Sequence, residues 1–467
     1  MRPLKTNNVT VTSSGLSFGT SGARGLVEQF TDEVCAAFTA AFLCSLDEHF
    51  PTKRLAIAID RRPSSPVMAS ACYGMAKAMG YQVDYYSVLP TPALALKAMH
   101  DGIPAIMITG SHIPFDRNGI KFYRPDGEIT KHDESLISSV DAPVIEFSSE
   151  LPEPSILAKE YYLDYFKQLF PTSFLCGKRI GVYEHSAAGR EITTELLAYF
   201  GAKVISLGIS DEFVPIDTEA VSNEDRQRGV EWSQQYQLDA IVSTDGDGDR
   251  PLVADEQGQW LRGDLLGLLC AQTLGIQALA VPVSCNSAIE ESGSFKKVTR
   301  TRIGSPYVIE GMAKLSKHFS SVAGFEANGG FLTDHLPTRD ALLPVLALFK
   351  YAYDLQKPIS ALVAALPKRF TASDRLQNIP TDLSKQKLAL WEADLQTFQQ
   401  DLSLEFDISK LDNTDGLRVT LFNNEIIHLR PSGNAPELRC YVEASSIDRA
   451  EELLQTTLNT ISKKIYL

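Results

Sequence analysis

The strongest constraint on the fold is a repeated alternation of short apolar segments with helical segments. Residues 54–60 (RLAIAID) are typical of a buried strand, and the pattern predicts a helix that starts at Ser64 and stops at Gly80. The segments YQVDYYSV, PALALKAMH and AIMIT continue this alternation as far as residue 109. Strands and helices that alternate at this spacing predict an α/β layer with a mostly parallel sheet.

The alternation restarts twice after this first layer. Residues 146–155 (EFSSELPEPS) are acidic and contain prolines, as expected of a linker. A second layer ends at the segment LDAIVSTDGDGDR, and a third begins with a helix at Asp264 and ends at SSVAGFEANGG. Near the C-terminus, residues 384–402 predict an amphipathic helix, and the turn FNNE predicts a pair of antiparallel strands.

The length of the chain indicates several domains. It has 467 residues, whereas a single hydrophobic core stops growing near ~250 residues. We predict three α/β domains of similar topology followed by a smaller α+β domain. Their predicted ranges are 1–148, 156–253, 254–367 and 368–467.

The charge and the N-terminal sequence limit the partners. The formal net charge is −14, whereas a nucleic-acid-binding protein needs a basic surface that neutralises phosphates. We therefore expect no nucleic acid, although a few arginines can still bind a small anion. The segment MRPLKTNNVTVTSSG lacks the apolar core of a signal peptide, and no apolar stretch reaches ~18 residues. We expect a cytoplasmic protein without a membrane partner, either a monomer or a weak homo-oligomer.

The segment STDGDGDRPLVADEQGQW (residues 243–260) concentrates negative charge. Asp245, Asp247 and Asp249 alternate with glycines, and three crowded carboxylates repel one another unless a cation lies between them. Their hard oxygen atoms suit Mg²⁺. An EF-hand is excluded, because its sixth position requires glycine where this loop has Arg250 and because both flanks are typical of strands.

A second loop combines a serine with several basic and polar side chains. In AIMITGSHIPFDRNGIKFY (residues 105–123), Ser111 follows an apolar strand, at the position where α/β sheets present residues to ligands. A serine hydroxyl is a weak nucleophile and needs a base or a metal ion. His112 and Lys121 are the candidates within the same segment.

Three further segments are weaker signals when taken alone. The glycine-rich loop FGTSGARG ends at Arg24 and is compatible with anion binding. The segment GFEANGGF places Glu326 and Asn328 where they can bind vicinal sugar hydroxyls, although it is also typical of a simple turn. The segment LRPSGNAPELR predicts either a proline-glycine turn or a phosphate-binding nest, whose side chains would be Arg430, Ser432, Asn434 and Arg439.

Taken in order, these motifs resemble the α-D-phosphohexomutase superfamily, which includes phosphomannomutases and phosphoglucomutases. The resemblance extends over nearly the whole chain, through FGTSGxRG, TGSHxPxDxNGxK, DGDGDR, an E-x-[SN]-G loop and RPSGxxPxLRxYVE. It implies an α/β protein of four domains around a central cleft. The phosphoserine, metal, sugar and phosphate loops would belong to the first, second, third and fourth domains.

The resemblance also implies a role for each motif residue. Ser111 would be the phosphoserine, and it would hold Mg²⁺ with Asp245, Asp247 and Asp249. Proton transfer and charge stabilisation would be served by Lys121, His112, Arg24 and Arg250. The hydroxyl and phosphate groups of the substrate would contact Glu326, Asn328, Arg430, Ser432, Gly433, Asn434 and Arg439.

The implied reaction moves a phosphoryl group between C6 and C1 of a hexose phosphate. Phosphoserine donates its phosphoryl group to the substrate. The resulting hexose 1,6-bisphosphate, which also serves as activator, reorients end over end while bound, and its other phosphate then returns to Ser111. We expect conversion of mannose 6-phosphate to mannose 1-phosphate, which supplies GDP-mannose and polysaccharide synthesis. A phosphoglucomutase or dual-specificity mutase is the alternative, because the two sugars differ only at C2. A metal-dependent sugar-phosphate phosphatase and a regulator without catalysis are further alternatives.

Two departures from the family pattern concern proton transfer. Many relatives carry a histidine where this chain has Gly330, and SHIP replaces the usual SHNP, so that Ile113 stands beside Ser111. Whether His112 takes over proton transfer is left open by the sequence.

Overall fold

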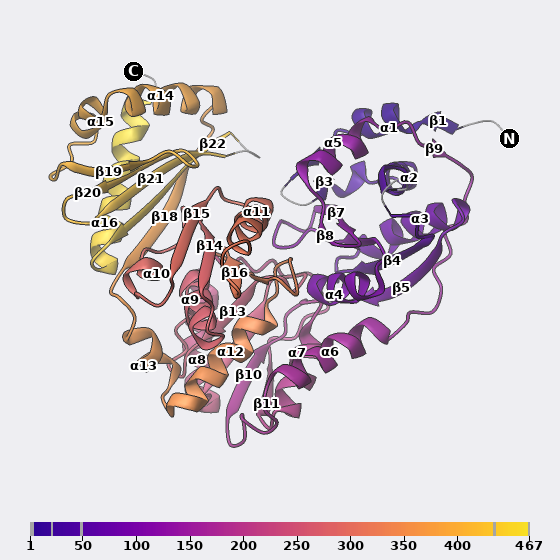
Figure 1. Ribbon diagram of the computed structural model, residues 1–467, viewed down its shortest axis with the longest axis horizontal. Coiled ribbons are helices and arrows are strands. Elements are labelled where there is room, and N and C mark those ends of the chain that lie inside the picture. Colours follow the sequence, from indigo (N-terminus) through magenta and orange to yellow (C-terminus); the bar gives the residue numbers. More distant parts are fainter. Residues whose placement is uncertain (1–3, 20–21, 47–49, 433–435, 466–467) are drawn as a thin grey trace. The chain divides into compact units, whose positions relative to one another are not determined.

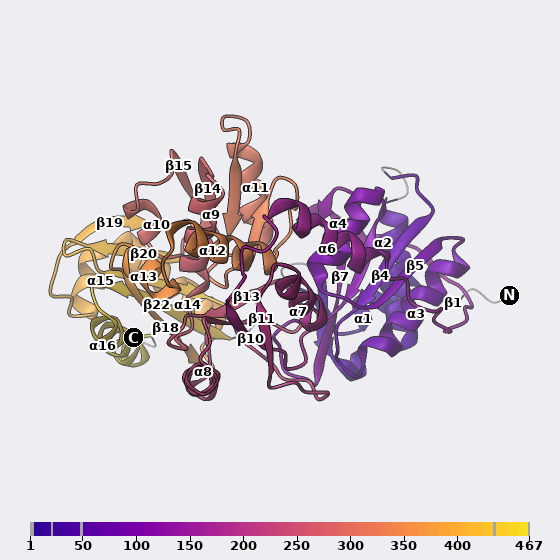
Figure 2. The same ribbon diagram turned by 90° about the horizontal axis from the view of Figure 1, so that it is seen from below.

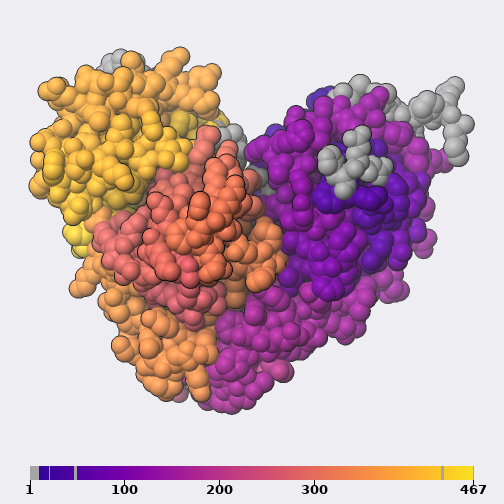
Figure 3. Space-filling view, viewed as in Figure 1, coloured from indigo at the N-terminus to yellow at the C-terminus, as the bar shows by residue number. Residues whose placement is uncertain are grey.

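The computed structural model describes residues 4–19, 22–46, 50–432 and 436–465 (Figure 1). The chain divides into two compact units, one made of residues 1–276 and 323–362 and the other of residues 277–322 and 363–467. Within each unit, side chains fill the space between the ribbons (Figure 3). The predicted α/β class is confirmed, because helices alternate with the strands of several sheets. The four domain boundaries stay a prediction.

The first sheet changes strand direction at the serine loop. Its strands, in spatial order, are β2 (Ser17–Phe18), β3 (Gly22–Leu26), β7 (Arg117–Arg124), β6 (Ala105–Ile108), β4 (Arg54–Ile59) and β5 (Gln82–Val88), and β8 (Gly127–Glu128) pairs with β7. The strands β5, β4 and β6 are parallel, whereas β7 and β3 run antiparallel to their neighbours. The chain therefore turns back directly after β6, and Ser111 lies in this turn.

Helices cover both faces of the first sheet. In Figure 1 its strands lie between α4 (Thr91–Asp101) on one side and α1 (Asn7–Ser13), α2 (Asp32–Leu46) and α5 (Lys131–Ser139) on the other. The apolar face of α2 packs on the sheet, where the rings of Phe42 and Phe122 are 4.8 Å apart. Helix α3 (Ser65–Ala78) starts after Ser64 and ends before Gly80, close to the predicted limits. The short elements of this layer are η1 (Val27–Gln29) and the antiparallel pair β1 (Leu4–Thr6) and β9 (Pro143–Val144).

The second sheet repeats this arrangement. Its order is β11 (Lys203–Leu207), β10 (Arg179–Tyr183), β12 (Ala240–Thr244) and β13 (Pro251–Ala254), in which only the β12–β13 pair is antiparallel. The three aspartates lie in the turn between β12 and β13, so the predicted flanking strands are confirmed. The helices are α6 (Leu157–Leu169), α7 (Arg190–Tyr199) and α8 (Asn223–Tyr236), and α7 lies beside β10 and β11 in both views (Figures 1 and 2).

The third layer also carries its motif on an antiparallel turn. The strands β14 (Ala278–Pro282) and β15 (Lys297–Thr301) are parallel, and β16 (Val322–Phe325) and β17 (Phe331–Thr333) form a hairpin around Glu326 and Asn328. The helices of this part are α9 (Gly263–Thr273), α10 (Ala288–Glu291), α11 (Ser305–Leu315), α12 (Leu342–Leu355) and α13 (Ile359–Ala364). In all three layers, therefore, the chain reverses at the motif.

The C-terminal sheet is wholly antiparallel, as predicted. Its order is β18 (Phe370–Gln377), β22 (Glu437–Ala444), β21 (Ile426–Pro431), β20 (Leu417–Leu421) and β19 (Ile408–Asp412), and α16 (Ile447–Lys464) packs on β18 and β22. The helix predicted over residues 384–402 is two helices, α14 (Thr381–Ala393) and α15 (Leu395–Asp401). Asp394 interrupts them, because its side chain caps the N-terminus of α15. No helix in the described part of the chain is long and apolar enough to cross a membrane.

Candidate active site

Ser111 lies at the end of β6 and is fully buried, with 0% of its surface exposed. Its φ angle is +53°, in the left-handed region that side chains other than glycine rarely adopt. The backbone N–H donates to Oγ1 of Thr109 at 2.8 Å, and the Ser111 hydroxyl donates to Oδ2 of Asp245 at 2.6 Å. The serine loop and the aspartate loop, 134 residues apart in sequence, are thus in direct contact.

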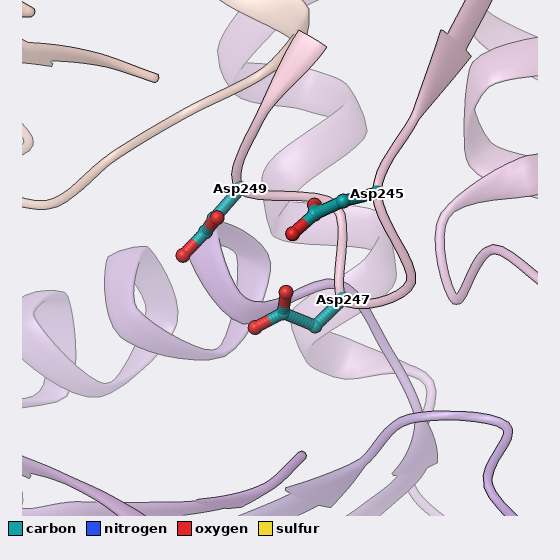
Figure 4. A group of neighbouring side chains, drawn as sticks. All are labelled: Asp245, Asp247 and Asp249. Carbon is teal, nitrogen blue, oxygen red and sulfur yellow. The ribbon is translucent and has the colours of Figure 1, made fainter. Parts of the chain in front are cut away.

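The carboxylates of Asp245, Asp247 and Asp249 converge from one turn (Figure 4). They are buried, and one oxygen atom from each lies within 4.8 Å of the others. Oδ1 of Asp247 and Oδ1 of Asp249 accept no hydrogen bond from any described residue. Burial raises the pKa of Asp245 well above its usual range, and the charges of Asp247 and Asp249 add to this effect. Buried hard oxygen atoms without donors fit a divalent cation.

Lys121 provides positive charge beside this group. It lies on β7, and its Nζ is 2.6 Å from Oδ2 of Asp247 and 2.9 Å from Oδ2 of Asp249. Burial alone would lower the pKa of Lys121, but these two carboxylates raise it above its ordinary value. Thr91 also donates to Asp247, at 2.7 Å. Lys121 therefore remains charged at neutral pH.

His112 and Arg250 also lie close to the serine, and Nε of Arg250 is 3.5 Å from Oδ1 of Asp249. The guanidinium of Arg250 donates to Nδ1 of His112 at 3.1 Å, and Oγ of Ser111 is 3.4 Å from the same nitrogen. The charge of Arg250, together with burial, lowers the pKa of His112 to about 3, so the imidazole is neutral at pH 7. Burial and Arg250 also lower the pKa of Arg24 to about 10. Arg24 is nevertheless charged, and it lies on β3 opposite Gly119 of β7.

Glu326 and Asn328 follow β16 in a tight turn and are both buried. Oδ1 of Asn328 accepts the N–H of Gly330 at 3.0 Å, and its carbonyl accepts the hydroxyl of Thr218 at 3.1 Å. The carbonyl contact ties this turn to the chain segment between β11 and α8.

Arg339 links two of the motifs and was missed by the sequence analysis. Its guanidinium donates to Glu326 at 3.0 Å and to Asp249 at 2.8 Å, and the side chain is almost fully buried. Although burial acts in the opposite direction, Arg339 and Lys121 hold the pKa of Asp249 well below its usual range. In the sequence, Arg339 is recognisable only as an arginine ahead of a helix, and this pattern does not indicate which residues it contacts.

The C-terminal motif lies in the other unit, between β21 and β22. Arg430 and Arg439 face each other across these strands, an arrangement of like charges that an anion would stabilise. Nε of Arg430 is 2.9 Å from Oδ2 of Asp415, and the Ser432 N–H donates to the carbonyl of Glu437 at 2.8 Å. The predicted residues Gly433 and Asn434 lie outside the described residues.

Comparison with known proteins agrees with this arrangement of motifs. Family models match the chain at residues 15–141, 262–370 and 361–459, as phosphoglucomutase/phosphomannomutase α/β/α domain I, α/β/α domain III and C-terminal domain. A phosphomannomutase of Salmonella muenchen is 53% identical, with 97% of each chain covered. A phosphomannomutase of Sinorhizobium fredii is 41% identical, with 97% of this chain and 100% of that protein covered.

The fold is similar to that of solved structures. A phosphoglucomutase/phosphomannomutase family protein from Burkholderia thailandensis superposes with a TM-score of 0.76 at 18% identity, with 98% of each chain covered. The matches in sequence extend over nearly the full length of the chain. The chain therefore belongs to the phosphoglucomutase/phosphomannomutase family of the α-D-phosphohexomutase superfamily.

Proposed function

We propose that the protein transfers a phosphoryl group between C6 and C1 of mannose phosphate through a phosphorylated Ser111. The observation that carries this proposal is the 2.6 Å hydrogen bond between Ser111 and Asp245, since it joins the proposed nucleophile to a proposed metal ligand. The names of the two similar phosphomannomutases support mannose phosphate as substrate.

The charges around Ser111 support a phosphate there. Arg24, Lys121, Arg250 and Arg339 contribute four formal positive charges, and the three aspartates and Glu326 contribute four formal negative charges when all of them are ionised. A divalent cation and a phosphate dianion together would leave this balance unchanged. Asp245, Asp247 and Asp249 would hold Mg²⁺ with the phosphate of Ser111, and the ion would neutralise charge on the phosphoryl group.

The side chains of the chain itself divide the remaining work. Lys121 is fixed by two carboxylates and provides a stationary charge beside the migrating group. Neutral His112 is the proposed group for proton movement near the serine oxygen, since Gly330 has no side chain for that purpose, and Arg250 would have to release Nδ1 for this role. Glu326 and Asn328 would bind sugar hydroxyls, and Arg430, Ser432, Gly433, Asn434 and Arg439 would bind the other phosphate.

The names of the two similar phosphomannomutases favour a mutase over a phosphatase. A mutase must exclude water from the phosphoserine until the sugar hydroxyl attacks, and the buried position of Ser111 is compatible with this requirement. We therefore place transfer to a bound hexose phosphate, with hexose 1,6-bisphosphate as intermediate and activator, ahead of hydrolysis.

The proposal is tested with Ser111→Ala. Ser70→Ala is the control, because among the described residues the hydroxyl of Ser70 bonds only the carbonyl of Val67 in its own helix. We expect the purified protein to convert mannose 1-phosphate to mannose 6-phosphate with Mg²⁺ and glucose 1,6-bisphosphate, and to carry one phosphate in intact-mass spectra. Ser111→Ala should lose both properties, and Ser70→Ala neither.

A substrate panel tests the sugar preference. The same coupled assay with glucose 1-phosphate should give a lower kcat/KM than with mannose 1-phosphate. A preference for glucose above tenfold would exclude the mannose assignment, and steady release of inorganic phosphate without bisphosphate would indicate the phosphatase.

A further inference from the structure

Arg62 follows β4 and lies under the serine loop. Only 1% of its surface is exposed, and its guanidinium donates to backbone carbonyls. Nη1 donates to the carbonyls of Pro114 at 2.7 Å and Arg117 at 2.8 Å. Nη2 donates to the carbonyls of Ser111 at 3.0 Å and Ile113 at 2.5 Å. One side chain thus satisfies four carbonyls of the loop that contains the nucleophile.

Asp60 and Phe213 fix the guanidinium itself. Oδ2 of Asp60 is 3.3 Å from Nε of Arg62, and the same carboxylate accepts the Ser65 hydroxyl and the N–H of Gly110. The ring of Phe213 covers the guanidinium, with Cζ of Arg62 3.9 Å from the ring centroid. Because Phe213 belongs to the segment between β11 and α8, two α/β layers of the same unit hold this side chain.

The glycine ahead of the nucleophile is explained by Arg62. A Cβ atom at Gly110 would lie 2.4 Å from Cζ of Arg62, which is shorter than real contacts allow. The next residue, Ser111, has the strained φ of +53°. A non-glycine residue in this conformation persists only where surrounding contacts over-determine it, and the four carbonyl bonds are such contacts.

We propose that Arg62 is the positioning residue of the nucleophile, which holds Ser111 in its left-handed conformation by binding the carbonyls of the loop. The inference rests on the proposed function, because it concerns the same serine. Without the guanidinium, the loop can relax toward a negative φ at Ser111 and move the hydroxyl away from Asp245. A displacement of about 1 Å at a reacting atom can cost about 10²-fold in rate.

The test compares Arg62→Ala and Arg62→Lys with Arg61→Ala. Arg61 is the matched control, because it precedes Arg62 directly but bonds Ala187 and Glu191 instead of the serine loop. We expect Arg62→Ala to lower kcat about 10²-fold while KM for mannose 1-phosphate changes less than about threefold. Arg62→Lys should also be impaired, since a single ammonium cannot bind four carbonyls. Arg61→Ala should behave as the wild type.

Two further readouts separate positioning from a general loss of structure. Hydrogen exchange in a peptide covering residues 109–119 should accelerate in Arg62→Ala, while peptides of the C-terminal sheet exchange as in the wild type. Added methylguanidinium should restore part of the activity of Arg62→Ala and none of the activity of Ser111→Ala. If Arg62→Ala fails to fold, the role of Arg62 is tested with Arg62→Lys and with Phe213→Leu, which removes the ring that covers the guanidinium. Hydrogen exchange in residues 109–119 should accelerate in both variants.

Different results would refute the proposed phosphoryl transfer and the role of Arg62. An inactive wild type without phosphate on Ser111 would refute the proposed function and, with it, the role of Arg62. An active, phosphorylated wild type whose Arg62 variants match Arg61→Ala in kcat and in exchange at residues 109–119 would refute the role of Arg62 alone.

Discussion

Gly330 leaves room for the side chain of Arg339. A Cβ atom at residue 330 would lie 2.7 Å from Cδ of Arg339, a distance that forces the arginine to move. Because Arg339 bridges Asp249 and Glu326, Gly330→Ala should disturb both. We expect kcat/KM for hexose phosphate to fall about tenfold, which corresponds to about 1.4 kcal/mol of transition-state stabilisation. Steady-state kinetics of the variant measures this loss.

A control and a double variant show whether the effect passes through Arg339. Gly189→Ala brings its Cβ only to 3.4 Å from Pro90, an ordinary contact, and should leave kcat/KM unchanged. Gly330→Ala combined with Arg339→Gln should be no worse than Arg339→Gln alone, because both changes remove the same bridge. Losses that add in full would mean that Gly330 acts independently of Arg339.

Single residues differ in how far the sequence predicts them. Ser111 and the three aspartates stand in contiguous motifs at strand ends, where both the chemistry and the location can be recognised. The partners of Arg339 lie 90 and 13 residues away, and those of Arg62 lie 49 to 55 residues away. Such roles arise only when strands and layers that are distant in sequence come together, so no local pattern marks them.

Among the elements, the start of α12 depends on a buried carboxylate. Oδ1 of Asp340 accepts the N–H of Leu343 at 2.6 Å, and Oδ2 accepts the hydroxyl of Tyr162 from α6. Tyr162→Phe should lower the free energy of unfolding at pH 7.5 by about 1.5–3 kcal/mol, because a charged acceptor loses a donor. Urea unfolding measures the change. Tyr161→Phe, at the neighbouring position of α6, serves as control and should have a smaller effect.

The same carboxylate predicts a dependence of stability on pH. Burial raises the pKa of Asp340 to about 6, above the value of about 3.9 of an unfolded chain. Between these values the folded protein binds more protons, so this group makes the free energy of unfolding fall as pH rises from about 4 to about 6. Asp340→Asn should show a flatter profile than the wild type over this range. An unchanged slope in Asp340→Asn would contradict the prediction.

The helices and strands could be predicted from the sequence where the spacing of apolar residues determines them. The apolar strands and the turns that reverse the chain at each motif follow from runs of apolar residues and from glycine. The break at Asp394 was missed, because the apolar spacing continues through it while a side-chain cap ends one helix and begins the next.

At the scale of the whole molecule, a divalent cation should act on one unit only. The three carboxylates that fit it belong to the first unit, and their mutual repulsion is relieved when the ion binds. Compared with EDTA-treated protein, Mg²⁺ should slow hydrogen exchange in peptides covering residues 105–125 and 240–255, but not in residues 417–444. Asp247→Asn should abolish the difference, and equal protection in both units would argue against a site at these aspartates.

The proposed phosphate nest in the other unit should control substrate affinity separately from the chemistry at Ser111. Arg430 and Arg439 are paired across β21 and β22, and Asp415 offsets part of their charge, so an anion would gain affinity from both arginines. Arg430→Ala should raise KM for mannose 1-phosphate about tenfold or more, because a charge-assisted contact contributes about 1.5–3 kcal/mol. The intact mass of Arg430→Ala should still include the phosphate on Ser111.

Lys410→Ala removes an exposed cation of β19, so it tests for a general effect of charge and should leave KM unchanged. If Arg430→Ala kept the wild-type KM, the C-terminal turn would have a structural role only, and substrate binding would have to be assigned to the first unit alone.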